Sequence, residues 1–577
     1  MRIGQHAAQG VATQLWIASI MALCLPLANA PASAQQSFTV AIDTGLVIGS
    51  PTTADNGEAV EKFLGIPYAA PPVGALRWVA PEQPLPLQKP LLANQFGPGC
   101  MQATAEQGSQ SGPTTPPGAS EDCLTLNVWT PVTALEVSRV WRPKELEEWA
   151  RSHSRLPVMV FIHGGGYVTG WSGFPLYEGT NLAARGNVVV VSMNYRLGAF
   201  GFLAQSALAA TNPAGVAGNY GLLDQRAALQ WVQQNIAGFG GDAHRVMVFG
   251  ESAGGGSVCA HLTSPGSAGL FSRAGAQSGF CGQPLPTLTQ AIAAPGGGDS
   301  FAAAIGCSGA TNVAACERSV PASIILGASQ TARFGPVVDG PSGFLPLDPL
   351  AAFRAGQFHR MPVLFGGNQD EGTLFVAFKY LLHPAPNPVP PDPTAYAAAI
   401  ASFMNPVAAS DPSIVQQVVD LYPFTNYPSP TQGVAAVYGD ELACYTEAAI
   451  KALSTHTLTY GYQFAAQNVI AGFPPIPGFT FGTYHGSELP FVFDNLLTPA
   501  VAGGADLSAL MNRYWSSFAR FGFPLGAPFW PPYVASRGNS MQLREFGQTA
   551  VGRSQHNCVF WDAINDPASV TSQSPRR

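Results

Sequence analysis

Short runs of β-branched and apolar residues alternate with segments of helical length through the middle of this chain. The stretches RLPVMVFIH, NVVVVSMNY and RVMVF have strand length. Between the last two, NYGLLDQRAALQWVQQNIAGFGGD has helical length and ends at a Gly-Gly-Asp stop. This alternation is typical of parallel strands that are covered by helices. We therefore expect an α/β fold, with a large, mostly parallel central sheet and helices on both faces.

A serine between two glycines lies at the end of one expected strand. In RVMVFGESAGGGSV, Ser252 follows the strand and precedes a helix that we expect to run through AGGGSVCAHLTS to Pro265. A sharp turn at the carboxyl end of a buried strand would expose the hydroxyl as a nucleophile, at the edge where α/β sheets place their ligands. In a chain with 63 glycines, however, the G-x-S-x-G pattern also arises by chance. The prediction therefore depends on partner residues elsewhere.

Three consecutive glycines follow an earlier strand, in FIHGGGYVTG. Glycine allows backbone N–H groups to approach a ligand closely, which is what a developing oxyanion requires. A tight turn without chemical purpose is the alternative. Because this loop follows a strand of the same expected sheet as Ser252, we predict that it binds an oxyanion.

The composition limits the classes of ligand. The 577 residues are 46% hydrophobic and 11% charged, with a formal net charge of -7. A large buried core is therefore available, and there is no overall basic character for binding nucleic acid. The sequence has no C-x-x-C pair and no tight His/Cys cluster that would support a zinc or redox site. We expect a small neutral or apolar ligand, no cofactor, no metal and no nucleic-acid partner, and we leave the oligomeric state open.

Residues 1–34 have the organisation of a secretory signal peptide. A charged start is followed by the apolar stretch LWIASIMALCLPLANA and then by the small residues of PASAQQ. The apolar stretch is too short to span a bilayer comfortably, and Leu23 does not suit a lipoprotein site at the next residue. We expect cleavage near Ala34–Gln35, which leaves residues 35–577 as a single domain without a transmembrane segment, secreted or periplasmic.

Two further segments are predicted to be peripheral. Residues 136–155 are dense in charge, with Pro143 placed as a first helical residue, and predict a solvated surface helix inserted before the next strand. The proline-rich stretch HPAPNPVPPDPTAY predicts an exposed connection within a helical excursion that forms part of a cap over the site.

Nine stretches distributed over nearly the whole mature chain follow the order of one protein family. They are FLGIPYAAPPVGALRW, EDCLTLNVW, FIHGGGY, GNYGLLDQRAALQWVQQNIAGFGGD, VFGESAGG, PVVDG, GGNQDEG, HGSELPFVF and CVFWD. In these stretches the chain resembles the type-B carboxylesterase/lipase family, which includes cholinesterases and bacterial para-nitrobenzyl-type esterases. The resemblance implies the α/β-hydrolase fold and a serine hydrolase that cleaves carboxylic esters without a cofactor.

The same resemblance implies a Ser-Glu-His triad. Ser252 matches the nucleophile, Glu371 of DEG the acid and His485 of HGSE the general base, in the chain order that this fold uses. Asp370 is the competing acid, but the acid of the family directly precedes the glycine. The implied oxyanion donors are the backbone N–H groups of Gly165, Gly166 and Ala253.

Other polar residues near these motifs are given supporting roles. Glu251 and Ser278 resemble positions beside the triad, with a purely structural role as the alternative. For His163 and His261, which lie in the strand-end motif and in the helix after Ser252, packing or backbone hydrogen bonding is the expected use.

Export permits disulfide bonds, and eight cysteines remain after the signal peptide is removed. Spacing alone leaves the connectivity open. The resemblance implies the pairs Cys100–Cys123, Cys307–Cys316 and Cys444–Cys558. It leaves Cys259 and Cys281 free, and the position of Cys259 inside an expected buried helix is typical of an inert core thiol.

The expected substrate is a small or medium carboxylic ester. In cholinesterases the loop closed by the first disulfide supplies an aromatic face for a quaternary ammonium. Here that loop, MQATAEQGSQSGPTTPPGASED, contains no Trp, Tyr or Phe, so a choline ester is not expected as the preferred substrate. Two alternatives remain: a lipase acting on lipid esters, although the sequence shows no clear apolar-faced lid, and a non-catalytic adhesion relative, against which the intact triad argues.

Overall fold

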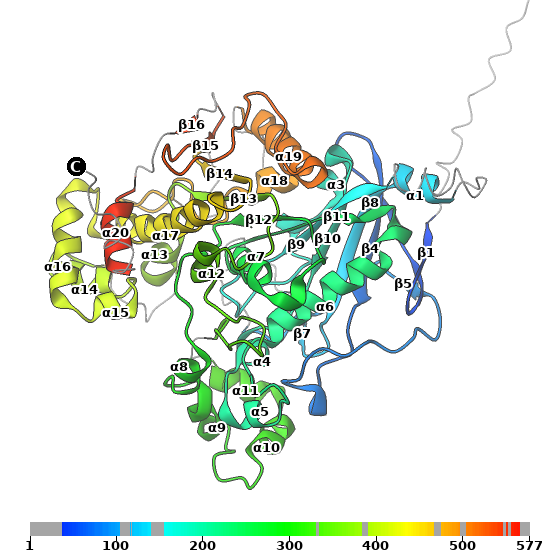
Figure 1. The fold of residues 1–577 in the computed structure, drawn as a ribbon, viewed down its shortest axis with the longest axis horizontal. Helices are drawn as coiled ribbons and strands as arrows, with labels where there is room; N and C mark the ends of the chain where they lie inside the picture. Colours follow the sequence, from blue (N-terminus) through cyan, green and yellow to red (C-terminus); the bar gives the residue numbers. More distant parts are fainter. Residues whose placement is uncertain are drawn as a thin grey trace, which may run out of the picture. The chain divides into compact units, whose positions relative to one another are not determined.

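The computed structural model describes most of the chain after the expected signal peptide (Figure 1). The described residues are 37–103, 116, 118–139, 155–329, 334–382, 391–466, 475–496, 503–545, 550–551 and 556–565. Three predictions lie wholly or mostly outside them: the signal peptide, the surface helix within residues 136–155 and the start of the proline-rich connection, residues 383–390. No helix in the described part is both long and apolar enough to span a bilayer.

An 11-stranded sheet runs through the described structure in the order β16-β15-β14-β13-β12-β11-β9-β10-β8-β4-β3. Its strands are β3 (Ser50–Thr53), β4 (Ala59–Pro67), β8 (Thr125–Pro131), β9 (Leu156–Ile162), β10 (Val189–Met193), β11 (Gly241–Glu251), β12 (Arg273–Gln277), β13 (Val363–Asn368), β14 (Thr459–Phe464), β15 (Ser540–Leu543) and β16 (Ala550–Val551). From β10 through β9 and β11 to β15 all pairs are parallel. The outer strands β16, β8, β4 and β3 pair antiparallel. The expected mostly parallel sheet is confirmed.

Side chains of the central strands enter two separate cores. Along β9, Val158, Val160 and Ile162 belong to one core, whereas Met159 and Phe161 belong to the other. Successive side chains of a strand point to opposite faces, so a strand that is buried on both faces needs a continuous apolar run. This requirement explains why RLPVMVFIH shows no polar alternation.

Helices cover both faces of the sheet (Figure 1). The first core receives side chains from α6 (Tyr220–Asn235), α7 (Ala253–Thr263), α12 (Pro349–Ala355) and α17 (Pro430–Ser454). The second core receives side chains from α3 (Thr180–Gly186), α18 (Leu489–Phe493) and α19 (Gly504–Phe521). The expected α/β architecture with helices on both faces is therefore confirmed.

A third core lies among helices that the chain forms mainly between β13 and β14. It contains side chains from α13 (Gly372–Tyr380), α14 (Tyr396–Ala401), α16 (Pro412–Leu421), α17 and α20 (Cys558–Asn565). The 25-residue helix α17 contributes to both this core and the first core. The helical excursion expected around the proline-rich connection is thus packed onto the sheet through α17.

The remaining elements lie outside the large sheet and its main helices. Two small sheets contain β1 (Thr39–Ile42), β2 (Gly45–Ile48) and β5 (Leu91–Leu92), and β6 (Gly99–Cys100) and β7 (Ala119–Ser120). The shorter helices are α1 (Val132–Arg139), α4 (Gly198–Phe202), α5 (Ser206–Ala210), α8 (Leu288–Ile292), α9 (Phe301–Ala304), α10 (Val313–Ser319), α11 (Ala322–Ala328) and α15 (Pro406–Ala409).

Four disulfide bonds join described cysteines. They are Cys100–Cys123, Cys259–Cys281, Cys307–Cys316 and Cys444–Cys558. The expectation that Cys259 and Cys281 are free is therefore wrong. Helix α7 packs so closely on the turn after β12 that a Cβ added to Gly255 would lie 2.7 Å from Gly279 Cα. This packing brings the two cysteine Cα atoms to 6.0 Å, within the range that a disulfide requires.

Replacing Cys259 and Cys281 together by alanine is expected to lower the free energy of unfolding. The bond closes a loop with a sequence separation of 22 residues, so constraint of the unfolded chain accounts for about 3 kcal/mol. Denaturant unfolding under nonreducing conditions measures this loss. A nonreducing peptide map should also recover the linked peptide, and alkylation of both thiols in the unreduced protein would contradict the pairing.

One carboxylate is buried in the third core. Glu441 of α17 accepts hydrogen bonds from Tyr445 Oη at 3.0 Å and from the backbone N–H of Asn405 at 3.3 Å. Burial outweighs these bonds and raises the pKa of Glu441 to about 7. A carboxyl group whose pKa is raised by folding makes the folded state bind a proton more tightly than the unfolded state. Its favourable contribution is complete below its ordinary pKa and is lost as the pH rises through the raised value.

The substitution Glu441→Gln is expected to change how stability depends on pH. Relative to the wild type, the melting temperature of the variant should improve between about pH 5 and about pH 8, because the variant has no buried group to ionise. Thermal unfolding across this range, with the exposed Glu58→Gln as the matched control, measures the difference. A constant offset between wild type and variant would show that Glu441 does not titrate in this window.

Candidate active site

Ser252 occupies the sharp turn between β11 and α7. Its backbone has φ 58° and ψ −124°, a strained conformation that residues other than glycine rarely adopt. A Cβ added to Gly254 would lie 1.9 Å from the carbonyl oxygen of Ile162, and one added to Gly250 would lie 2.5 Å from the backbone of Gly254. Glycine on either side is therefore needed for the turn to form against the end of β9. The turn leaves Ser252 partly exposed at the carboxyl edge of the sheet.

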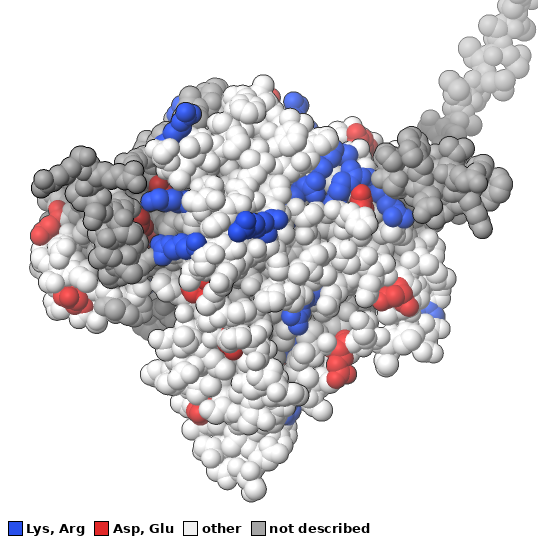
Figure 2. All heavy atoms as spheres, viewed as in Figure 1, with Lys and Arg blue, Asp and Glu red and all other residues white. Residues whose placement is uncertain are grey.

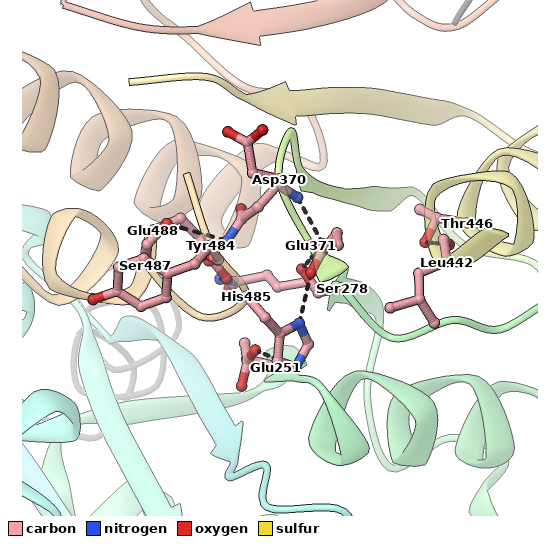
Figure 3. Close-up of polar contacts among 12 residues, drawn as sticks. Glu251, Ser278, Asp370, Glu371, Leu442, Thr446, Tyr484, His485, Ser487 and Glu488 are labelled. Carbon is pink, nitrogen blue, oxygen red and sulfur yellow. Dashed lines mark hydrogen bonds and ion pairs between the residues drawn. The ribbon is translucent and has the colours of Figure 1, made fainter. Parts of the chain in front are cut away.

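A carboxylate and an imidazole meet beside this turn (Figure 3). His485 Nδ1 lies 2.6 Å from Glu371 Oε2, and both side chains are buried. Glu371 follows β13, and its other oxygen accepts hydrogen bonds from Ser278 Oγ at 2.5 Å and from the backbone N–H of Asn368 at 2.7 Å. The carboxylate is thus held in place and orients the imidazole through Nδ1.

The second ring nitrogen of His485 faces the end of β11. Its Nε2 lies 3.2 Å from Oε1 of Glu251, the residue that directly precedes Ser252. Nε2 makes no hydrogen bond to any described residue, so the structure does not join His485 to the Ser252 hydroxyl. It does bring together His485, Glu371, Glu251 and Ser278 (Figure 3).

Three buried carboxylates determine the charge of the imidazole. Burial alone would lower the pKa of His485, but Glu251, Glu371 and Glu488 outweigh it and raise the pKa to about 9. Burial raises the pKa of Glu251 to about 8, partly offset by His485. The cluster therefore holds protons more tightly than isolated side chains would, and the imidazole stays protonated until the pH rises toward its raised pKa.

Several residues of this cluster escaped the sequence analysis. Glu488 accepts hydrogen bonds from Asn368 Nδ2 at 2.6 Å and from Gln277 Nε2 at 3.0 Å. Its position three residues after His485 in HGSE was the available signal. No local pattern marked Gln277 or Asn368, because each lies at the end of a different strand and meets Glu488 only in the folded sheet.

Aromatic rings flank the imidazole. The Phe280 ring is stacked with the His485 ring at 5.3 Å between centroids, and the Phe375 ring lies at 4.7 Å. Phe375 also packs on Tyr438 at 5.5 Å, and Tyr438 on Phe403 at 5.0 Å. Both rings that contact the imidazole are partly exposed, so they form an apolar wall beside it.

The glycine loop after β9 lies directly against the serine. A Cβ added to Gly164 would be 2.8 Å from Ser252 Cβ. Gly165 and Gly166 have φ 109° and 60°, values that glycine adopts at little cost. Ala253 begins α7, where backbone N–H groups have no partner within the helix. The predicted oxyanion donors and the predicted nucleophile thus lie at the carboxyl ends of the neighbouring strands β9 and β11.

The competing candidates have other partners. The Asp370 carboxylate accepts hydrogen bonds from the backbone N–H and the hydroxyl of Thr483, at 2.9 and 3.0 Å. It is Glu371, one residue later, that contacts His485. Among the described residues, no group of three or more His, Cys, Asp or Glu side chains could hold a metal ion.

The other two candidate histidines are fully buried and bonded within the core. His163 contacts the carbonyl of Gly164 through Nδ1 at 2.8 Å. His261 contacts Ser267 Oγ at 2.9 Å and Gln225 Oε1 at 3.1 Å. Burial lowers the pKa of His163 to about 4 and that of His261 to about 3, which keeps both rings neutral.

Fold and site together define an α/β-hydrolase with a serine at a strand–helix turn and an imidazole held by a glutamate. Residues 36–561 match the family model described as the carboxylesterase family. The chain belongs to this family and is a carboxylic ester hydrolase.

Three relatives are similar over most of their length. The chain is 34% identical to an acetylcholinesterase of Bungarus fasciatus over 577 aligned residues, which cover 94% of this chain and 88% of the relative. It is 34% identical to the fumonisin B1 esterase of Sphingopyxis macrogoltabida, over 81% of this chain and 79% of the relative. It is 33% identical to an acetylcholinesterase of Danio rerio, over 86% of this chain and 82% of the relative.

The substitution Glu251→Gln is expected to lower the pKa of His485. It removes a negative charge 3.2 Å from Nε2, so protonation of the imidazole becomes less favourable. Histidine-selective NMR titration measures the shift, with the exposed Glu82→Gln as control. An unchanged His485 titration in the Glu251 variant would show that Glu251 is not its charge partner.

Proposed function

We propose that the chain cleaves carboxylic esters through an acyl-enzyme, with Ser252 as nucleophile, His485 as general base and Glu371 as the group that orients the base. The observation that carries the proposal is the 2.6 Å contact between His485 Nδ1 and Glu371 Oε2, beside the strained turn that holds Ser252. The contact holds the Nδ1 proton toward Glu371, so the neutral imidazole, which forms as the pH rises through its raised pKa, accepts a proton at Nε2.

Each step of the proposed reaction uses a residue of this cluster. His485 Nε2 turns from Glu251 to the hydroxyl of Ser252 and takes its proton as Oγ bonds to the ester carbonyl carbon. The protonated imidazole then gives this proton to the leaving alcohol as the ester C–O bond breaks. A water molecule then gives a proton to His485 and attacks the acyl carbon. The bond from this carbon to Ser252 Oγ breaks, Oγ takes the proton back from His485, and the acid is released.

The developing oxyanion would be bound by backbone N–H groups. We assign this role to Gly165, Gly166 and Ala253, because the glycine loop lies against Ser252 and Ala253 begins α7. Each such donor contributes about 3 to 4 kcal/mol to stabilisation of the transition state.

The proposed substrates are neutral aryl and alkyl esters of small or medium acids. The rings of Phe280 and Phe375 pack against the imidazole of His485 and form an apolar wall. Such a wall favours binding of esters with apolar substituents. Two relatives are acetylcholinesterases and one is a fumonisin B1 esterase. Residues 101–122 of this chain contain no aromatic residue to receive a quaternary ammonium, so a choline ester is not proposed as the preferred substrate.

We also propose that the chain is exported and works outside the cytoplasm. The charged, apolar and small-residue order of residues 1–34 supports a cleaved signal peptide, with residues 35–577 as the mature domain. The four disulfide bonds support an oxidising compartment.

The substitution Ser252→Ala is expected to abolish ester hydrolysis and to leave the melting temperature nearly unchanged. It removes one partly exposed oxygen and opens no large cavity. Hydrolysis of a para-nitrophenyl ester and labelling by a fluorophosphonate probe measure the effect. Ser319→Ala, an exposed serine of α10, is the matched control, and substantial turnover by the Ser252 variant would contradict the mechanism.

The substrate class is tested by a panel of esters of graded acyl length. Aryl and alkyl esters are compared with an amide and with an emulsified triglyceride. Fast turnover of short neutral esters and slow turnover of the emulsion support the proposal. The reverse order would identify a lipase.

A further inference from the structure

Large apolar side chains are exposed at the amino ends of the parallel strands. Phe521, the last residue of α19, is 50% exposed, and Phe523 in the turn that follows is 41% exposed. Their rings are stacked with 5.7 Å between centroids. Leu458 precedes β14 and Val534 precedes β15, and each is 42% exposed. We call these four side chains the apolar patch.

Contacts of neighbouring residues place the four patch residues at one end of the sheet. A Cβ added to Gly522, between the two phenylalanines, would lie 3.0 Å from Pro362 Cγ at the start of β13. The carbonyl of Leu458 accepts a hydrogen bond from the first residue of β13 at 2.9 Å. The backbone N–H of Tyr533, just before Val534, donates to the carbonyl of Thr459, the first residue of β14, at 2.7 Å. Since β13 and β14 are neighbours, all four side chains lie at one end of the sheet.

Arginines border the patch. Arg273 Nη2 donates to the carbonyl of Arg520 at 3.2 Å, and a Cβ on Gly522 would lie 3.8 Å from Arg273 Nε. Burial and then the charge of Arg245 lower the pKa of both Arg273 and Arg520, so the three guanidinium groups are close enough to repel one another. In the described chain, the only carboxylate that forms an ion pair with any of them is Asp242, 2.7 Å from Arg245.

The positive charge extends over this part of the surface. Figure 2 shows the densest group of Lys and Arg side chains where Figure 1 draws α3 and α19, with few acidic side chains among them. Arg360, before β13, and Arg537, before β15, are also exposed. The whole chain carries a net charge of -7, so this basic surface is a local exception. A positively charged surface on an otherwise acidic chain favours an anionic partner.

We propose that this basic and aromatic surface binds an anionic lipid surface peripherally. Arginine pairs well with lipid phosphates, and exposed Phe and Leu side chains enter the boundary between headgroups and acyl chains. The stacked phenylalanine pair favours a partner with an apolar interior over a purely polar polyanion. A second copy of the chain is disfavoured, because a two-fold contact would place arginines of like charge against each other.

The position of the surface is compatible with enzymatic activity. Ser252 and Glu371 follow the carboxyl ends of β11 and β13, whereas the patch lies at the amino ends. A strand of six residues such as β13 separates the two edges by about 20 Å. Docking through the patch therefore leaves the catalytic edge facing solvent, and the inference does not depend on the proposed substrate or mechanism.

Vesicle sedimentation with the full mature chain tests the proposal. Binding to phosphatidylcholine vesicles that contain phosphatidylglycerol is expected at low ionic strength, and it should weaken as salt is added. The double variants Phe521→Ser with Phe523→Ser, and Arg360→Gln with Arg537→Gln, should each weaken binding about tenfold. The matched control, Leu85→Ser with Lys89→Gln, changes an exposed leucine and an exposed lysine elsewhere and should bind like the wild type.

The same variants separate binding from folding and catalysis. All of them should retain the wild-type melting temperature and turnover of a soluble para-nitrophenyl ester, since none lies near Ser252. Several outcomes would overturn the proposal: no binding to the anionic vesicles, equal binding to pure phosphatidylcholine, or undiminished binding by both patch variants. Binding of polyglutamate without vesicle binding would identify a polar polyanion as the partner, and a dimer lost in the phenylalanine variant would identify self-association.

Discussion

The close approach of α7 to the ends of β9 and β11 is the contact on which the site depends. Gly254 has no side chain, and its Cα therefore fits against the carbonyl oxygen of Ile162. This approach forces the strained backbone of Ser252 and places Glu251 against His485. A second close contact of α7, between Gly255 and Gly279, brings Cys259 and Cys281 together. A side chain at position 254 would disturb the turn of Ser252 and the position of Glu251, because both lie at the contact with Ile162.

The site concentrates buried negative charge, which is costly unless it is well bonded. Glu251, Glu371 and Glu488 are each no more than 2% exposed. Amide, hydroxyl and backbone groups donate hydrogen bonds to Glu371 and Glu488. Glu251 instead has the cationic imidazole of His485 as its partner. The high proton affinity of the imidazole follows from this arrangement. The charge and the orientation of the imidazole are thus set by its surroundings.

The two ends of the parallel sheet have different characters for a topological reason. Loops at the carboxyl ends carry Ser252, Glu371 and the glycine loop, whereas the amino ends carry the apolar patch and its arginines. Because parallel strands all begin at one edge and end at the other, residues far apart in sequence gather at each edge without crossing the core. The proposed chemistry and the proposed lipid binding therefore use opposite edges of the sheet.

The sequence by itself determined the parts of this protein that arise from local chain geometry. Continuous apolar runs specify strands buried on both faces, and glycines around Ser252 specify a sharp turn, because both signals act over a few neighbouring residues. Helix α6 illustrates the limit of such signals: it was expected to continue to the Gly-Gly-Asp stop, but it ends at Asn235 and a 3-10 turn leads into β11. The sequence indicated that this segment is a helix, whereas tertiary packing set the residue at which the helix ends.

Only the tertiary structure decided which distant groups meet. The bond between Cys259 and Cys281, the contact of Glu251 with His485 and the hydrogen bonds of Glu488 all join elements that the sheet order brings together. The arginines at the amino edge come from three separate elements and have no common sequence pattern. Side-chain partners across a sheet depend on strand order and register, and no short stretch of the chain encodes these.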